Sequence, residues 1–71
     1  MSKPWIVKDP DHAFGAARVR GMNLRADVLV AMVRAGEIIS TIAWWYEVPE
    51  AAVRAALRYA KNHPEELEGR S

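Results

Sequence analysis

Residues 37–60 read EIISTIAWWYEVPEAAVRAALRYA, and this stretch decides the expected fold. Apolar side chains recur at helical spacing over residues 37–46 and again over residues 50–62 or 63, so we predict one helix in each segment. The intervening Glu-Val-Pro breaks the first helix, and Pro49 suits the start of the second. Pro64 stops the second helix. Two helices joined by so short a turn are typical of a helix-turn-helix, whose second helix enters the DNA major groove.

The preceding sequence predicts one more helix and two short strands. Residues 25–35 carry apolar side chains at helical spacing, and Gly36 is a natural helix stop. Residues 5–8 and 18–20 are extended segments, each closed by turn-forming residues. Because two such strands are barely stable alone, we expect them to pack on the helices or against a second subunit.

Together these elements predict an all-α, homeodomain-like helix-turn-helix domain of three helices with a short N-terminal β-arm. The domain is expected to span residues 1–64, followed by a short acidic tail over residues 65–71. The predicted core consists of inward-facing apolar residues of the three helices, namely Val28, Leu29, Met32, Ile38, Ile42, Trp45, Val53 and Leu57.

Length and composition limit the possible classes of protein. The chain has 71 residues, 51% of them hydrophobic, which indicates one ordered domain. It has no cysteine, which excludes a disulfide and a thiolate-ligated metal. Since so small a core is marginal, we expect a homodimer to complete the fold. The sequence lacks the apolar segment of a signal peptide and any apolar run near the roughly 20 residues of a membrane span, so a cytoplasmic protein without membrane contact is expected.

Charge is unevenly distributed along the chain. Residues 1–64 hold nine Lys or Arg against six acids, whereas residues 65–71 hold three Glu against one Arg. A basic body with an acidic tail fits a nucleic-acid binder with a partner-binding tail. It also fits an ordinary domain with a soluble end, and charge alone favours that second interpretation.

Three basic residues of the last helix are the first candidates for DNA contact. Arg54, Arg58 and Lys61 recur at i, i+4 and i+7 and therefore share a face. Such side chains neutralise phosphates, and arginine also reads guanine in the major groove. The alternative is a solvated face on which Glu50 pairs with Arg54.

Arg18 and Arg20 are further candidates for DNA contact. On a strand both side chains point to one face, opposite to Val19. From there they can grip phosphate beside the last helix. The alternatives are ion pairs with Asp9 or Asp11, or with a second subunit.

Three apolar residues are candidates for contact with a partner protein. Trp44 lies opposite the core stripe of its helix, so either a partner protein or the β-arm of the same chain is expected to cover it. Trp45 and Tyr46 are expected to be buried in the core. Trp5 is expected to pack on the helices or across a dimer. Leu67 stands among the glutamates of the tail, which is either a partner-binding segment or a disordered end.

The sequence gives no support for a metal, a cofactor or an enzyme. His12 and His63 are the only histidines and lie far apart, whereas a zinc site needs three or four ligands at tight spacing. No glycine-rich phosphate loop and no nucleophile elbow is present. We therefore expect a binding protein with neither a cofactor nor a small-molecule substrate.

Four segments, taken in order, resemble the bacterial family known as domain of unknown function 433. They are Arg18-Val-Arg-Gly-Met-Asn-Leu24, Arg34-Ala-Gly36, Tyr46, and Val53-Arg-Ala-Ala-Leu-Arg-Tyr-Ala60. The family usually has Thr-Arg where Met22-Asn23 stand, and acidic residues where this chain has Ser40, Thr41, Trp44 and Trp45. The second helix is therefore more apolar here than in the family pattern.

The resemblance implies a function that the residues alone do not. Members look like compact, usually dimeric helix-turn-helix proteins, and many are similar to antitoxins whose toxin is a nuclease-like protein resembling the PIN domain. The resemblance therefore implies that this chain is a DNA-binding antitoxin that neutralises its toxin and represses its own promoter. The alternatives are a stand-alone transcriptional regulator and a protein-interaction adaptor that does not bind DNA.

Overall fold

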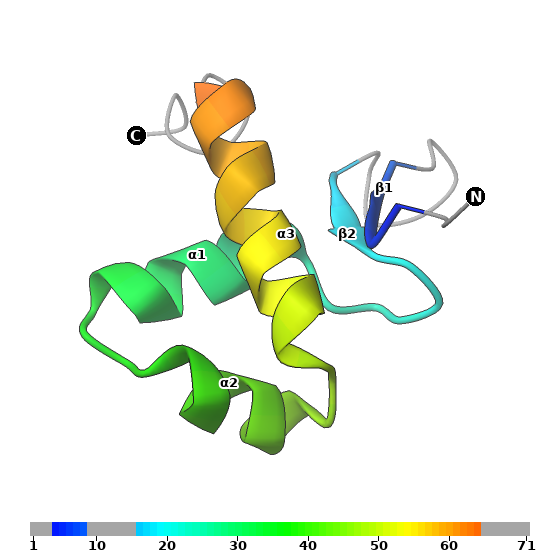
Figure 1. Cartoon of the computed structure of the whole chain (residues 1–71). Coiled ribbons are helices and arrows are strands. Elements are labelled where there is room, and N and C mark those ends of the chain that lie inside the picture. The colour runs from blue at the N-terminus through cyan, green and yellow to red at the C-terminus, as the bar shows by residue number, and fades with distance from the viewer. Residues whose placement is uncertain (1–3, 9–15, 65–71) are drawn as a thin grey trace.

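The computed structural model describes residues 4–8 and 16–64, and it contains three helices and a small sheet. The elements, in chain order, are β1 (Ile6–Val7), β2 (Arg18–Val19), α1 (Ala26–Arg34), α2 (Ile39–Tyr46) and α3 (Glu50–Asn62) (Figure 1). Each helix predicted from the sequence is present, with ends displaced by no more than two residues. The described chain is thus mostly helical, with an N-terminal two-stranded arm.

Two left-handed residues end the first two helices. Gly36 follows α1 with φ +101°, a conformation that glycine adopts without the steric cost of a Cβ. Glu47 ends α2 with φ 57°, and Val48 behind it is buried. Pro49 was predicted to be the first residue of the last helix, but its ψ of 152° makes it the extended residue just before α3. The turn between α2 and α3 is therefore short and anchored in the core.

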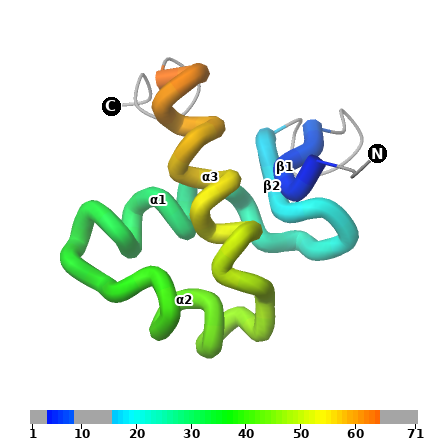
Figure 2. Tube along the Cα trace, viewed as in Figure 1, coloured from blue at the N-terminus to red at the C-terminus, as the bar shows by residue number. Residues whose placement is uncertain are grey.

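The arm is an antiparallel pair that packs on the helices. Ile6 lies opposite Val19, and the Arg20 backbone amide donates to the Trp5 carbonyl at 2.7 Å. The amide of Ala26 donates to the Ala17 carbonyl at 2.9 Å, so the strand leads directly into α1. The Cα trace shows the arm lying beside α3 (Figure 2). The expectation that the strands need a helical layer beneath them is met within one chain.

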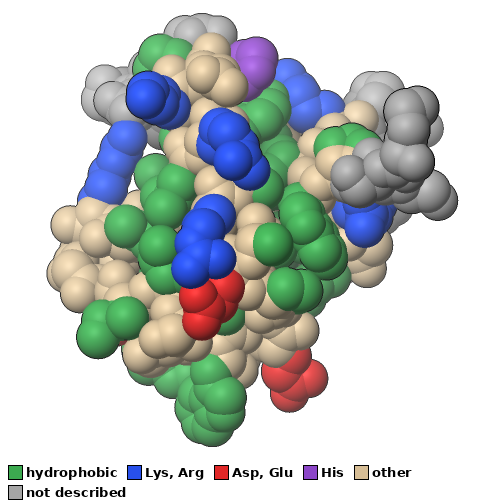
Figure 3. All heavy atoms as spheres, viewed as in Figure 1, with side chains coloured by type: hydrophobic (Ala, Val, Ile, Leu, Met, Phe, Trp, Pro, Cys, Tyr) green, Lys and Arg blue, Asp and Glu red, His purple; other side chains and the backbone are tan. Residues whose placement is uncertain are grey.

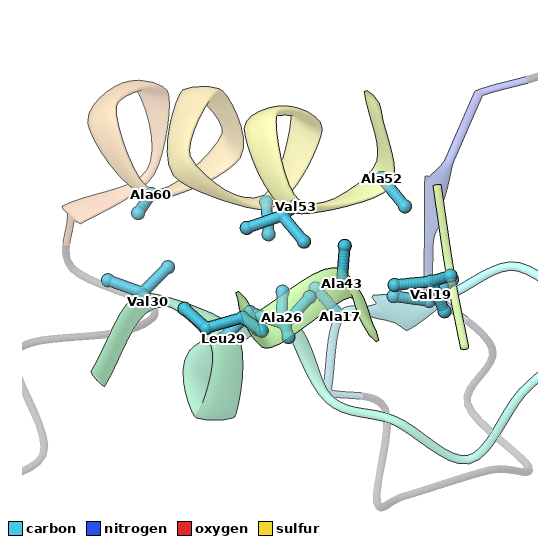
Figure 4. Close-up of a cluster of buried hydrophobic side chains, with 12 residues drawn as sticks. Ala17, Val19, Ala26, Leu29, Val30, Ala43, Ala52, Val53 and Ala60 are labelled. Atoms are coloured by element: carbon cyan, nitrogen blue, oxygen red, sulfur yellow. The ribbon is translucent and has the colours of Figure 1, made fainter. Parts of the chain in front are cut away.

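Small side chains dominate the core. Leu29, Ile42 and Val53 are fully buried, as the sequence predicted, and Met32 and Leu57 pack against them partly buried. The sequence prediction missed the alanines that bring α1, α3 and the arm close together (Figure 4). Among residues 4–8 and 16–64, the buried residues are Ala17, Val19, Ala26, Leu29, Val30, Ile42, Ala43, Val48, Ala52, Val53, Ala56 and Ala60.

Three predicted core residues are exposed, which corrects the sequence prediction. Ile38 is 66% exposed because α2 begins at Ile39, and the backbone of Ile38 just before the helix is extended. Trp45 is 48% exposed because the inner face of α2 is centred on Ile42 and Ala43, which leaves the indole at the side. Val28, 38% exposed, lies beside the buried face of α1 rather than on it. Tyr46 is partly buried against the core.

Within the described residues, none of the helices combines the length and the apolar character that crossing a lipid bilayer requires.

Candidate nucleic-acid interface

Arg54, Arg58 and Lys61 form a basic ridge along α3, which we call the α3 ridge. All three side chains are exposed, while Ala52, Val53, Ala56 and Ala60 fix the opposite side of the helix in the core. Lys and Arg side chains follow one another along this face of the molecule (Figure 3). Burial of these four residues fixes the orientation of α3 about its axis and keeps the ridge on the outside of the molecule.

An ion pair lies at the N-terminal end of the α3 ridge. Arg54 Nη2 donates to Glu50 Oε1 at 2.8 Å, and the two side chains are 58% and 44% exposed. This pairing is the alternative that the sequence left open for Arg54. Exposed pairs at this spacing are worth only about 0.3–0.5 kcal/mol. An incoming phosphate therefore competes with Glu50 for Arg54 at little cost.

The first turn of α3 is small and poor in hydrogen-bond donors. Ala51 is exposed and contributes only a methyl group, next to the carboxylate of Glu50. In a helix-turn-helix the early residues of the second helix reach the base edges. A surface without bulk permits close approach of the backbone and apolar contact with a thymine methyl, but not bidentate base reading.

Arg18 and Arg20 stabilise the arm. Arg18 Nη1 donates to the carbonyl of Met22 at 3.1 Å, across the turn that follows β2. Arg20 Nη1 donates to the Pro4 carbonyl at 2.6 Å, and its guanidinium lies 4.9 Å from the centre of the Trp5 ring, a cation–π distance. Their alternative partners Asp9 and Asp11 lie outside the described residues. These contacts hold both arginines at the arm, and their role in DNA contact stays a prediction.

A groove of about 460 Å³ separates the arm from α3. Trp5 forms one wall, so it packs on a helix of the same chain, one of the two placements that the sequence allowed. Arg58 belongs both to this groove and to the α3 ridge. Tyr59 and Asn62 were not predicted from the sequence, although their spacing from Ala55 at i+4 and i+7 marks a second stripe on α3. The groove is lined by Pro4, Trp5, Ile6, Ala55, Arg58, Tyr59 and Asn62.

Trp44 and Leu67 are the two remaining candidates for contact with a partner protein, and the structure describes the first of them. Trp44 is 76% exposed, as its position opposite the core stripe predicted, and no described part of the arm covers it. Leu67 lies outside the described residues.

The described segments, 4–8 and 16–64, hold no group of three or more His, Cys, Asp or Glu side chains placed to bind a metal ion. His63 instead stacks on Tyr59, with the ring centres 4.3 Å apart. His12 lies outside these segments.

One family matches this arrangement along most of the chain. The family described as Protein of unknown function (DUF433) covers residues 6–60, from the first strand to the last buried turn of α3. The chain belongs to this family. The DUF433 match includes Arg18, Arg20, Arg54 and Arg58, and it ends just before Lys61. No curated protein and no solved structure matches the chain.

Proposed function

We propose that this protein is a DNA-binding antitoxin that represses its own promoter. In this proposal α2, the turn at residues 47–49 and α3 act as a homeodomain-like helix-turn-helix, with α3 as the recognition helix. The observation that carries the proposal is the α3 ridge, a row of exposed cations on the second of two helices joined by a short turn. The protein binds double-stranded DNA as a homodimer and has no catalytic role.

The ridge suits the backbone of DNA better than its bases. Its cations stand on the second to fourth turns of α3, and Arg54 and Arg58 can each meet a phosphate oxygen. The first turn supplies no long donor for base edges. We therefore infer that phosphate contacts provide most of the affinity, and that binding weakens steeply as salt rises.

The toxin part of the proposal follows from the family resemblance. The partner is a nuclease-like protein resembling the PIN domain, encoded beside this gene. Trp44 is exposed on a different helix, so protein contact there, whether with the toxin or with a second subunit, leaves the α3 ridge free to hold DNA.

Two experiments test the two halves separately. The first measures fluorescence anisotropy of a labelled duplex from upstream of the gene over a series of salt concentrations. Affinity that is the same at low and high salt refutes DNA binding by the ridge. The second expresses the adjacent reading frame alone and together with this protein, following growth and co-purification. A harmless neighbour that does not co-purify refutes the antitoxin role.

Two observations favour a protein-interaction adaptor as the second candidate. Glu50 neutralises part of the ridge by pairing with Arg54, and the outer side of α2 offers a large apolar surface. An adaptor predicts a salt-insensitive protein complex and no DNA complex. A stand-alone regulator, in contrast, predicts the DNA complex and a gene without a toxin beside it.

A further inference from the structure

The outer side of α2 is an uncharged and largely apolar surface, which we call the α2 face. Its members are Ile38, Ser40, Thr41, Trp44 and Trp45. Ile38 and Trp44 are 66% and 76% exposed, and α2 carries no acidic residue in its first turn and no basic residue in its last. The helix lies at the edge of the molecule, away from the β-arm (Figure 1). Two exposed indoles on one surface helix mark a contact site, because monomeric proteins rarely leave such patches open.

Within α2 itself the large and small residues of the α2 face are segregated along the helix, while Ile38 stands just before its first residue. Ser40 and Thr41 occupy the N-terminal half, and Trp44 and Trp45 follow one turn later. If two such faces meet with their helices antiparallel, the indoles of each copy lie over the small residues of the other. A two-fold axis generates this complementarity from a single surface. Parallel helices would instead place indole against indole and leave a gap over the serines.

The exposed area fits self-association. Ile38, Trp44 and Trp45 together expose on the order of 400 Å² of apolar surface per copy. Complete burial of this area in two copies, together with the polar rim at Ser40 and Thr41, amounts to about 1,000 Å², the lower limit for a specific interface. The core of the single chain is half alanine, so additional burial stabilises a fold that is marginal by itself.

The charges around the α2 face are compatible with antiparallel pairing of two α2 helices. Glu37 and Glu47 stand at the two ends of α2, both exposed. In the antiparallel pair each Glu47 approaches the N-terminal end of the partner's α2, which has no side-chain cap and no acid in its first turn. A carboxylate is favourable at that end of a helix and offsets repulsion from Glu37. The cations of the α3 ridge lie on a different helix and stay available.

We infer that the α2 face binds a second copy of this chain through antiparallel pairing of the two α2 helices. The inference rests on the homodimer of the proposed function and deepens it by naming the surface. It does not depend on DNA binding, so either can fail while the other stands.

The test is a swap of one large and one small residue. Sedimentation equilibrium gives the dimer dissociation constant of the full chain without DNA, for the wild type, Ser40→Trp, Trp44→Ser and the double variant. Both positions are exposed, and Ser and Trp have similar helix propensities, so all four proteins should fold, which circular dichroism verifies. Ala31→Ser, at an exposed position of α1, is the control that leaves the dissociation constant unchanged.

We expect each single variant to weaken the dimer at least about 100-fold, because two indoles are lost or two clashes gained per dimer. The double variant exchanges the large and the small residue between positions 40 and 44, so each introduced Trp lies over the introduced Ser of the other copy, and pairing returns to within about tenfold of the wild type. A wild type that is monomeric at about 100 µM overturns the inference. So does a dimer that survives Trp44→Ser, or a double variant whose losses simply add. A monomer whose Trp44 becomes shielded only by the neighbouring gene product assigns the α2 face to the toxin instead and also overturns the inference.

Discussion

Replacement of Glu50 by glutamine tests whether the α3 ridge meets DNA phosphate. Glu50 Oε1 accepts a hydrogen bond from Arg54 Nη2 at 2.8 Å, so in the wild type this carboxylate is paired with one of the cations of the ridge. A phosphate seated on Arg54 would lie about 6 Å from that carboxylate, and two unit charges at this distance repel by about 0.7 kcal/mol even at the dielectric constant of water. The variant should remove this repulsion and the competing ion pair, which adds about 0.3–0.5 kcal/mol.

The expected result of Glu50→Gln is therefore tighter DNA binding by about 1 kcal/mol per chain, or about fivefold. Stability should change in the opposite direction. Glu50 lies in the first turn of α3, where an acid stabilises the helix by about 0.3–1 kcal/mol, so the variant should unfold more easily. Anisotropy titrations with the upstream duplex at low salt measure the first effect, and urea unfolding measures the second.

Glu37→Gln is the matched control for Glu50→Gln. It makes the same change in net charge at an exposed position that precedes α2 and lies outside the ridge. The gain in affinity from Glu50→Gln should also shrink as salt rises, because counterions screen the repulsion. Equal gains from both variants, or no gain from Glu50→Gln, would refute the reasoning that Arg54 meets phosphate.

Three other predictions concern the ridge, the core and one helix end. Arg58→Ala and Lys61→Ala should each weaken DNA binding and reduce the slope of log affinity against log salt by about 0.9, with unchanged thermal unfolding; a full slope in either variant would remove that residue from the interface. Leu29→Ala should lower the free energy of unfolding by about 2–5 kcal/mol in urea titrations, because Leu29 is completely buried, and a smaller loss would mean that the core closes around the cavity. Gly36→Ala should cost about 1 kcal/mol although no atom lies within 4 Å of the added Cβ, because φ is +101° there; unchanged stability would show that the turn relaxes.

The helices were predictable because their signals are local. Gly36, Pro49 and Pro64 mark the ends of segments whose apolar residues recur at helical spacing. The Glu50–Arg54 pair followed from the same spacing, since residues four apart are neighbours on a helix. The α3 ridge was found in this way, and its exposure agrees with the sequence prediction.

The core and the groove were less predictable because they depend on contacts between distant segments. A search for large apolar side chains selects Trp45 and Ile38, whereas close packing of α1 on α3 selects small residues such as Ala26 and Ala56. Alanine carries too little hydropathy to identify a buried face by itself. The contact of Arg20 with Trp5 was likewise not predictable, because only the folded arm brings these two residues together.

The alanine-rich interior also limits how this protein can evolve and be engineered. Where two helices meet through methyl groups, any larger residue pushes them apart, so overpacking costs about 1–3 kcal/mol instead of filling space. Filling of internal cavities is consequently a poor route to a more stable variant. Variation among family members should concentrate on the outside of the molecule, where the sequence can diverge between paralogues without disturbing the closely packed helices.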